Sequence, residues 1–206
     1  MRMAVEDRRA QLIEAALAVA TEDGIAATTV RRVAEQAEVA LGVVHYAFAD
    51  KDELVAALAA RVVEELAEAS AAGLVFESQP DLATALDAAI AGVWETIEAT
   101  PREQLLTYEI TTFALRTPGL AGVARSQYAA SQAAVERLLT LVADTSGASW
   151  TRPVPELAGE VLAFLDGITL RWLVDRDGAA ARTRLDAVAR YLAASSRPRR
   201  RRKVRA

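Results

Sequence analysis

Apolar residues recur along most of the chain at the spacing of one helical face. In residues 8–23, Leu12, Ala16 and Ala20 fall on one side, and Gly24 follows where helices commonly end. The same periodicity, with the residues that start and stop helices, predicts further helices at about 30–37, 41–48, 51–72, 81–99, 101–116, 120–144, 155–175 and 179–194. No segment alternates in the manner of a strand. The pattern therefore indicates an all-α fold with a loop at 145–153.

The predicted helices within residues 8–48 are joined by tight turns, which is the arrangement of a helix-turn-helix. Val33 and Val44 would pack its interior, and the opposite face of the helix at 41–48 would be open to DNA bases. Gly42 adds no side chain there, so the backbone could approach DNA closely. We therefore predict these DNA contacts: Thr29, Arg31, Leu41, Gly42, Val43, His45, Tyr46 and Lys51.

The composition excludes several kinds of chemistry. The 206 residues include no cysteine and only one histidine, so disulfides, thiolate zinc sites and the usual nucleophilic relays are not expected. We expect no catalytic residue, metal site or cofactor, although chemistry carried by carboxylates alone stays open. No apolar run reaches the ~18 residues of a membrane span, and the start lacks the apolar region of a secretory signal. These features favour a cytoplasmic protein that does not enter a membrane.

The charge is divided unevenly along the chain. Residues 1–196 carry 17 Lys and Arg against 28 Asp and Glu, whereas residues 197–206 carry seven basic residues and no acid. Residues 1–72 contain 7 basic and 13 acidic residues, the reverse of the usual basic footprint of a DNA-binding domain. The basic tail could add phosphate affinity or could simply be a solubilising end.

The stretch RRAQLIEAALAVATEDGIAATTVRRVAEQAEVALGVVHYAFADKDELV, residues 8–55, resembles the DNA-binding domain of the TetR family of bacterial transcriptional regulators. The motif elements that carry the resemblance are Gly24, Thr28-Thr29, Val33-Ala34, Val39, Gly42, Tyr46-Ala47-Phe48, Lys51 and Leu54. Glu38 stands where the family usually has glycine, and the recognition helix is unusually apolar. We therefore expect few polar base contacts and more weight on thymine methyl groups and DNA shape.

The resemblance implies a helix-turn-helix domain at 1–50, a helical effector-binding and dimerisation domain at 51–196, and a basic disordered tail at 197–206. The residues that it implies for the effector pocket are Trp94, Tyr108, Glu109, Thr112, Phe113, Tyr128 and Phe164. Each aromatic could equally be an ordinary core residue, and Glu109 a solvated one. For the dimer interface, the resemblance and the apolar seam together indicate Val161, Leu165, Ile168, Trp172, Leu185, Val188 and Leu192.

The sequence thus favours a homodimeric regulator that represses by binding a palindromic double-stranded DNA operator and is released by a small-molecule effector. Activation instead of repression stays open. The alternative from another class is a helical ligand-binding or scaffolding dimer that has lost specific DNA binding. Glu38, the apolar recognition helix and the acidic N-terminal third all favour that alternative.

Overall fold

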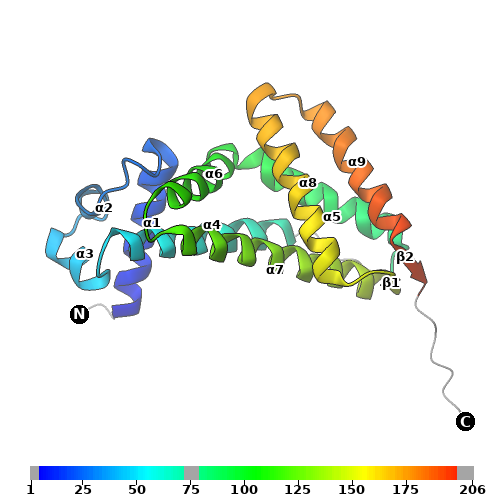
Figure 1. Ribbon diagram of the computed structural model, residues 1–206, viewed down its shortest axis with the longest axis horizontal. Coiled ribbons are helices and arrows are strands. Elements are labelled where there is room, and N and C mark those ends of the chain that lie inside the picture. The colour runs from blue at the N-terminus through cyan, green and yellow to red at the C-terminus, as the bar shows by residue number, and fades with distance from the viewer. Residues whose placement is uncertain (1–4, 72–78, 199–206) are drawn as a thin grey trace, which may run out of the picture. The chain divides into compact units, whose positions relative to one another are not determined.

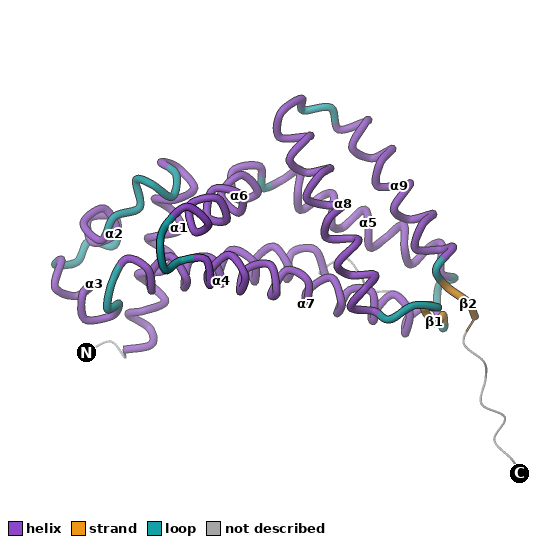
Figure 2. Tube along the Cα trace, in the orientation of Figure 1, coloured by secondary structure: helices purple, strands orange, loops and turns teal. Residues whose placement is uncertain are grey.

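The structure, a computed structural model, describes residues 5–71 and 79–198 (Figure 1). Within these residues the chain forms nine helices and one pair of short strands (Figure 2). The helices are α1 (Val5–Asp23), α2 (Val30–Gln36), α3 (Leu41–Ala47), α4 (Lys51–Ala71), α5 (Leu82–Ala99), α6 (Pro101–Arg116), α7 (Ala121–Ser146), α8 (Val154–Asp175) and α9 (Gly178–Ala194). Each lies within a few residues of its predicted position, so the all-α fold is confirmed.

Local residue chemistry explains most helix ends. Gly24 follows α1 with φ +83°, a left-handed conformation that glycine adopts without steric cost. Thr29 caps α2, because its hydroxyl accepts the N–H of Arg32 at 3.2 Å. Pro101 begins α6, but the Thr100 hydroxyl accepts from the Gln104 amide instead of capping the helix. Proline at the first helical position therefore marks this start better than the threonine before it.

The first of two compact units contains the residues up to Leu66 together with Thr100–Ala130. Here α1 packs against α2 and α3. One buried cluster joins these three helices to the start of α4, and its larger members are Leu12, Val33, Val44, Phe48 and Leu54. A second cluster joins α1 and α4 to α6 through Val55, Leu58, Val62, Leu106 and Ile110. The two units describe packing and not binding. The predicted boundary at residue 50 between a DNA-binding domain and an effector-binding domain therefore stays a prediction.

The second compact unit contains Ala67–Ala99 and the residues from Ser131 onward. In it α9 packs against both α5 and α8, and α8 and α9 run side by side in Figure 1. Its core is one large cluster whose bulkiest buried members are Leu86, Trp94, Leu157, Trp172 and Leu185. None of the helices in the described ranges is long and apolar enough to cross a membrane.

A two-stranded ribbon was not predicted. Strand β1 (Ala148–Trp150) lies in the segment predicted as a loop and pairs antiparallel with β2 (Ser196–Pro198). The pairing joins residues far apart in the sequence, so the local periodicity of the sequence could not predict it. It also places the first two residues of the predicted basic tail, Arg197 and Pro198, in a strand. The other tail residues, 199–206, lie outside the described residues.

Candidate functional site

The turn between α2 and α3 contains a conformational exception. Glu38 has φ +54°, in the left-handed region that favours glycine. The N–H of Val39 then donates to the carbonyl of Ala34 at 3.0 Å, which closes the turn. The turn of a helix-turn-helix therefore forms here without glycine, at the cost of local backbone strain.

Helix α3 presents an open face formed by four of the predicted DNA contacts. Leu41, Gly42, His45 and Tyr46 are all exposed, and Tyr46 is 81% exposed. A Cβ added at Gly42 would meet no atom of the described chain within 4 Å. Val43 is half-buried, while the opposite side of the helix is buried through Val44. The structure therefore brings four predicted contacts together on one solvent-facing surface.

The basic residues around α2 and α3 do not gather on one face. Arg31 is exposed and has no ion-pair partner in the part of the chain that the structure describes. Arg32 instead binds Asp23 at 2.5 Å, a contact that raises the pKa of the guanidinium. The ammonium of Lys51 lies 5.0 Å from the centroid of the Phe113 ring. Of the two basic residues among the predicted DNA contacts, Arg31 is exposed and Lys51 is half-buried against Phe113.

Five of the predicted effector residues lie on α6 and α7 in the first unit, and two of them contact segments that adjoin the helix-turn-helix. The Glu109 carboxylate accepts the N–H of Ile25, which follows α1, at 3.1 Å. Phe113 lies beneath Lys51 at the start of α4. The Thr112 hydroxyl donates to the backbone carbonyls of Tyr108 and Glu109. Tyr108 is half-buried and Tyr128 exposed.

The other two predicted effector residues, Trp94 and Phe164, lie in the second unit. Trp94 is buried and meets Trp172 edge to face at a centroid distance of 5.4 Å. Phe164 is exposed on α8 and meets Tyr191 of α9 edge to face at 5.8 Å. The seven residues are therefore divided between two units of packing.

One candidate effector contact was missed in the sequence. Gln127 of α7 is only 6% exposed, and its amide nitrogen donates to the carbonyl of Thr107 at 2.9 Å. Its side-chain oxygen is buried without a hydrogen-bond partner among the described residues. An unpaired buried acceptor is costly, so a donor group on a ligand would relieve it. The available signal was its spacing, since Gln127 shares a helical face with the apolar residues Leu120 and Ala124.

The residues predicted for the dimer interface lie in the chain's own core. Six are buried and Leu165 is half-buried, and all seven belong to the core of the second unit. Their own chain thus covers most of these side chains, and their role at a dimer interface stays a prediction. The opposite face of α8 is exposed through Ala163, Phe164, Gly167, Leu170 and Val174. That face, which we call the outer face of α8, exposes three large apolar side chains, Phe164, Leu170 and Val174.

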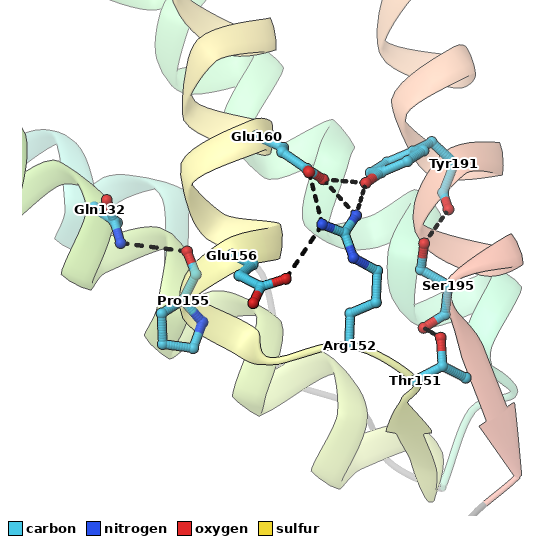
Figure 3. Close-up of polar contacts among 8 residues, drawn as sticks. All are labelled: Gln132, Thr151, Arg152, Pro155, Glu156, Glu160, Tyr191 and Ser195. Atoms are coloured by element: carbon cyan, nitrogen blue, oxygen red, sulfur yellow. Dashed lines mark hydrogen bonds and ion pairs between the residues drawn. The ribbon is translucent and has the colours of Figure 1, made fainter.

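A polar cluster lies beside the outer face of α8 (Figure 3). Arg152, which follows β1, donates to the Glu160 carboxylate at 2.7 and 2.8 Å and to the Tyr191 hydroxyl at 2.5 Å. The Tyr191 hydroxyl also donates to Glu160. Arg152 and Tyr191 together lower the pKa of Glu160, while the carboxylate raises the pKa of Tyr191. The cluster joins the ribbon to α8 and α9.

The family model described as bacterial regulatory proteins, tetR family, matches residues 12–58 of the chain. The matched segment runs from the middle of α1 into α4 and contains the whole of α2 and α3. The exposed face of α3 therefore belongs to the matched motif.

Longer similarities cover most of the chain. The HTH-type nicotine-responsive transcriptional repressor HdnoR of Paenarthrobacter nicotinovorans is 28% identical over 175 residues, which are 85% of this chain and 88% of that protein. The crystal structure of the multidrug binding protein EbrR complexed with imidazole is 30% identical, with a TM-score of 0.64, covering 88% of this chain and 94% of that one. EbrR complexed with ethidium is 27% identical, with a TM-score of 0.64, covering 90% and 98%.

Proposed function

The chain belongs to the TetR family of bacterial transcriptional regulators, and we propose that it represses transcription as a dimer on a palindromic operator until a small effector releases it. It is a DNA-binding regulator that responds to a ligand. The observation that carries the DNA-binding role is the open face of α3, where Leu41, Gly42, His45 and Tyr46 lie together beyond a buried Val44. A recognition helix reads bases with such a face.

The chemistry of that face supports a particular kind of reading. His45 and Tyr46 offer hydrogen bonds to base edges or phosphates, and Leu41 offers contact with thymine methyl groups. Gly42 leaves room for the close approach of a sugar-phosphate backbone. Since the described residues of α3 carry no lysine or arginine, much of the specificity would come from shape and apolar contact.

The outer face of α8 supports a dimer. Phe164, Leu170 and Val174 are large apolar side chains exposed along one side of a 22-residue helix. Exposed apolar patches of this kind commonly mark association surfaces. Pairing two copies through the same face gives a two-fold dimer, and two recognition helices then meet a palindromic site.

The effector that we propose is a small nitrogen-containing ring compound. The relatives named above respond to nicotine or bind imidazole and ethidium, which all belong to this class. In this chain the unpaired oxygen of Gln127 and the carboxylate of Glu109 are acceptors that suit N–H donors or a positive charge.

Helix α6 supports a route from the effector to DNA. Glu109 holds the segment after α1 through Ile25, and Phe113 lies beneath Lys51, which follows the recognition helix. A ligand that prefers a second arrangement of α6 would change both contacts. The extent to which the ligand releases the protein from DNA is then set by the difference between the ligand's affinities for the two arrangements.

Selection from random duplex DNA tests the proposed function. Wild-type protein is compared with the His45→Ala/Tyr46→Ala variant at fixed salt and with unrelated competitor DNA. Both side chains are exposed, so the variant should fold normally. We expect the wild type to enrich a palindrome and the variant to bind it at least tenfold more weakly. Failure of the wild type to enrich any sequence, or equal enrichment by both proteins, would contradict the proposal.

A further inference from the structure

One guanidinium group on α1 holds the end of the recognition helix. Arg9 donates from Nη1 to the carbonyl oxygen of Ala47, the last residue of α3, at 2.6 Å. Its Nη2 lies 2.8 Å from the carboxylate of Glu53 on α4. Its central carbon lies 4.3 Å from the centroid of the Phe48 ring. A single side chain therefore contacts the end of α3, the residue after it and the first turn of α4.

Helix α3 depends on such contacts because it is short. It has seven residues, far fewer than an isolated helix needs to be stable in water. At its N-terminus, Ala40 makes no side-chain cap hydrogen bond. At its C-terminus, the carbonyl of Ala47 has no partner within the helix, and a cation there also complements the helix dipole. Arg9 supplies both the donor and the cation.

Glu53 completes the connection between α3 and α4. Its carboxylate accepts the N–H of Ala49 at 2.9 Å and pairs with Arg9 on its other oxygen. Asp50 in turn accepts the N–H of Glu53 at 2.8 Å and so caps the start of α4. The two residues between Phe48 and α4 are therefore tied at both ends. The Arg9–Glu53 pair thus connects the end of α3 with the first turn of α4.

We propose that Arg9 is a positioning residue for DNA recognition: its guanidinium fixes the orientation of α3 and thereby of Leu41, His45 and Tyr46. The proposal rests on the proposed function, because it concerns the same DNA-reading face. Arg9 is not a phosphate contact in this account, since Glu53, Ala47 and the Phe48 ring already engage its guanidinium. A planar fork makes these contacts together, which an ammonium group cannot do.

The test is the Arg9→Lys variant, with Arg8→Lys as its matched control. Arg8 is the adjacent residue on α1 and bonds Gln11 within its own helix. Affinity is measured for the selected palindrome and for unrelated DNA over a range of salt concentrations. We expect Arg9→Lys to weaken specific binding at least tenfold while unrelated DNA is bound within twofold of wild type. Arg8→Lys should leave both unchanged.

A phosphate contact at Arg9 would give a different result. Lysine keeps the charge, so Arg9→Lys would then retain specific binding, and Arg9→Ala would lower the salt slope by about one for both DNAs. Either outcome overturns the proposal. The melting temperature of each variant is measured as well. A variant that loses specific binding but keeps the wild-type melting temperature has a displaced α3, whereas a lowered melting temperature indicates loss of folding. As a second variant, Glu53→Gln should reproduce the loss of specificity and should not add to it in the double variant.

Amide hydrogen exchange tests the positioning without DNA. In Arg9→Lys we expect faster exchange at residues 43–49 than in wild type, with the α5, α8 and α9 amides unchanged. Faster exchange in a protein that selects no DNA sequence would show that Arg9 holds α3 in place, but would reject the proposed function and with it the role of Arg9 in DNA recognition. Unchanged exchange at residues 43–49 would reject the role of Arg9 whatever the DNA result.

Discussion

Helices α3 and α8 both expose apolar side chains, but over very different lengths. The exposed face of α3 is contained in seven residues, about 10 Å of helix. The outer face of α8 runs from Ala163 to Val174, about 16 Å, and Val174 is 79% exposed. Its one basic side chain among the described residues 163–174, Arg171, is paired with Asp175 at 2.7 Å. The first surface suits a groove, and the second suits another protein helix.

The two helices also differ in how they are held. Helix α8 is fixed by burial, because Val161, Ile168 and Trp172 lie in a large core. Helix α3 contributes one buried residue, Val44, to the cluster that it shares with α1, α2 and α4, and Phe48 joins that cluster just after the helix ends. The end of α3 is also held by the hydrogen bond from Arg9. Burial tolerates small shifts, whereas a hydrogen-bonded guanidinium fixes distance and direction. A DNA-reading helix needs the second kind of support.

The largest effect that we expect is on the outer face of α8. Leu170 is 48% exposed in the single chain, so Leu170→Glu should leave folding nearly unchanged. In a dimer the new carboxylate would be buried without a partner, and we expect the dissociation constant to rise by about 100-fold or more. Sedimentation velocity measures this. Leu141→Glu on α7, at a leucine of the same unit that is 40% exposed, is the control. A monomeric wild type, or equal loss in both variants, would remove α8 as the interface.

A smaller effect is expected in the turn before α3. Replacing Glu38 by glycine removes the strain of a left-handed L-residue at φ +54° and should raise the free energy of unfolding by about 1 kcal/mol. For a chain of this size the melting temperature would rise by roughly 2–4 °C. Glu38→Ala is the control, because it removes the same charge and keeps the strain. Equal stability of the two variants would show that charge, not backbone strain, limits the turn.

The smallest effect is a titration beside the outer face of α8. The carboxylate of Glu160 accepts the Tyr191 hydroxyl and raises its pKa above the ordinary 10.0. The phenol is favoured by folding, so its contribution is present below pH 10 and is lost as the pH rises through the raised value. Phenolate absorbance of wild type minus that of Tyr191→Phe isolates this group. We expect a midpoint above 10.0 that falls toward 10.0 in Glu160→Gln, and a midpoint at or below 10.0 in wild type would refute the cluster.

Sequence periodicity predicted the helices well because their signals are local. Gly24 and Pro101 mark ends that the structure reproduces. The open face of α3 was also predictable, since Val44 separates buried from exposed positions in one turn. The ribbon between Ala148 and Pro198 was not, because its pairing depends on where the whole second unit brings the two segments.

The side of α8 that faces outward could not be read from the pattern. Val161 and Ile168 on one side are as apolar as Phe164 and Leu170 on the other, so periodicity alone gives two equal seams. Packing against α9, and against Trp94 of α5, decides between them. The role of Arg9 was hidden for the same reason, since its partners Ala47 and Glu53 are about 40 residues away in the sequence.

The most direct test of the account is a hydroxyl-radical footprint of wild type and Leu170→Glu on the selected DNA. If two α3 helices of a dimer joined through α8 read the operator, the wild type should protect two half-sites related by two-fold symmetry, about one helical turn or a multiple of it apart. Leu170→Glu should lose both at the same protein concentration. A single unsymmetrical protected site, or a footprint unchanged by Leu170→Glu, would contradict the account.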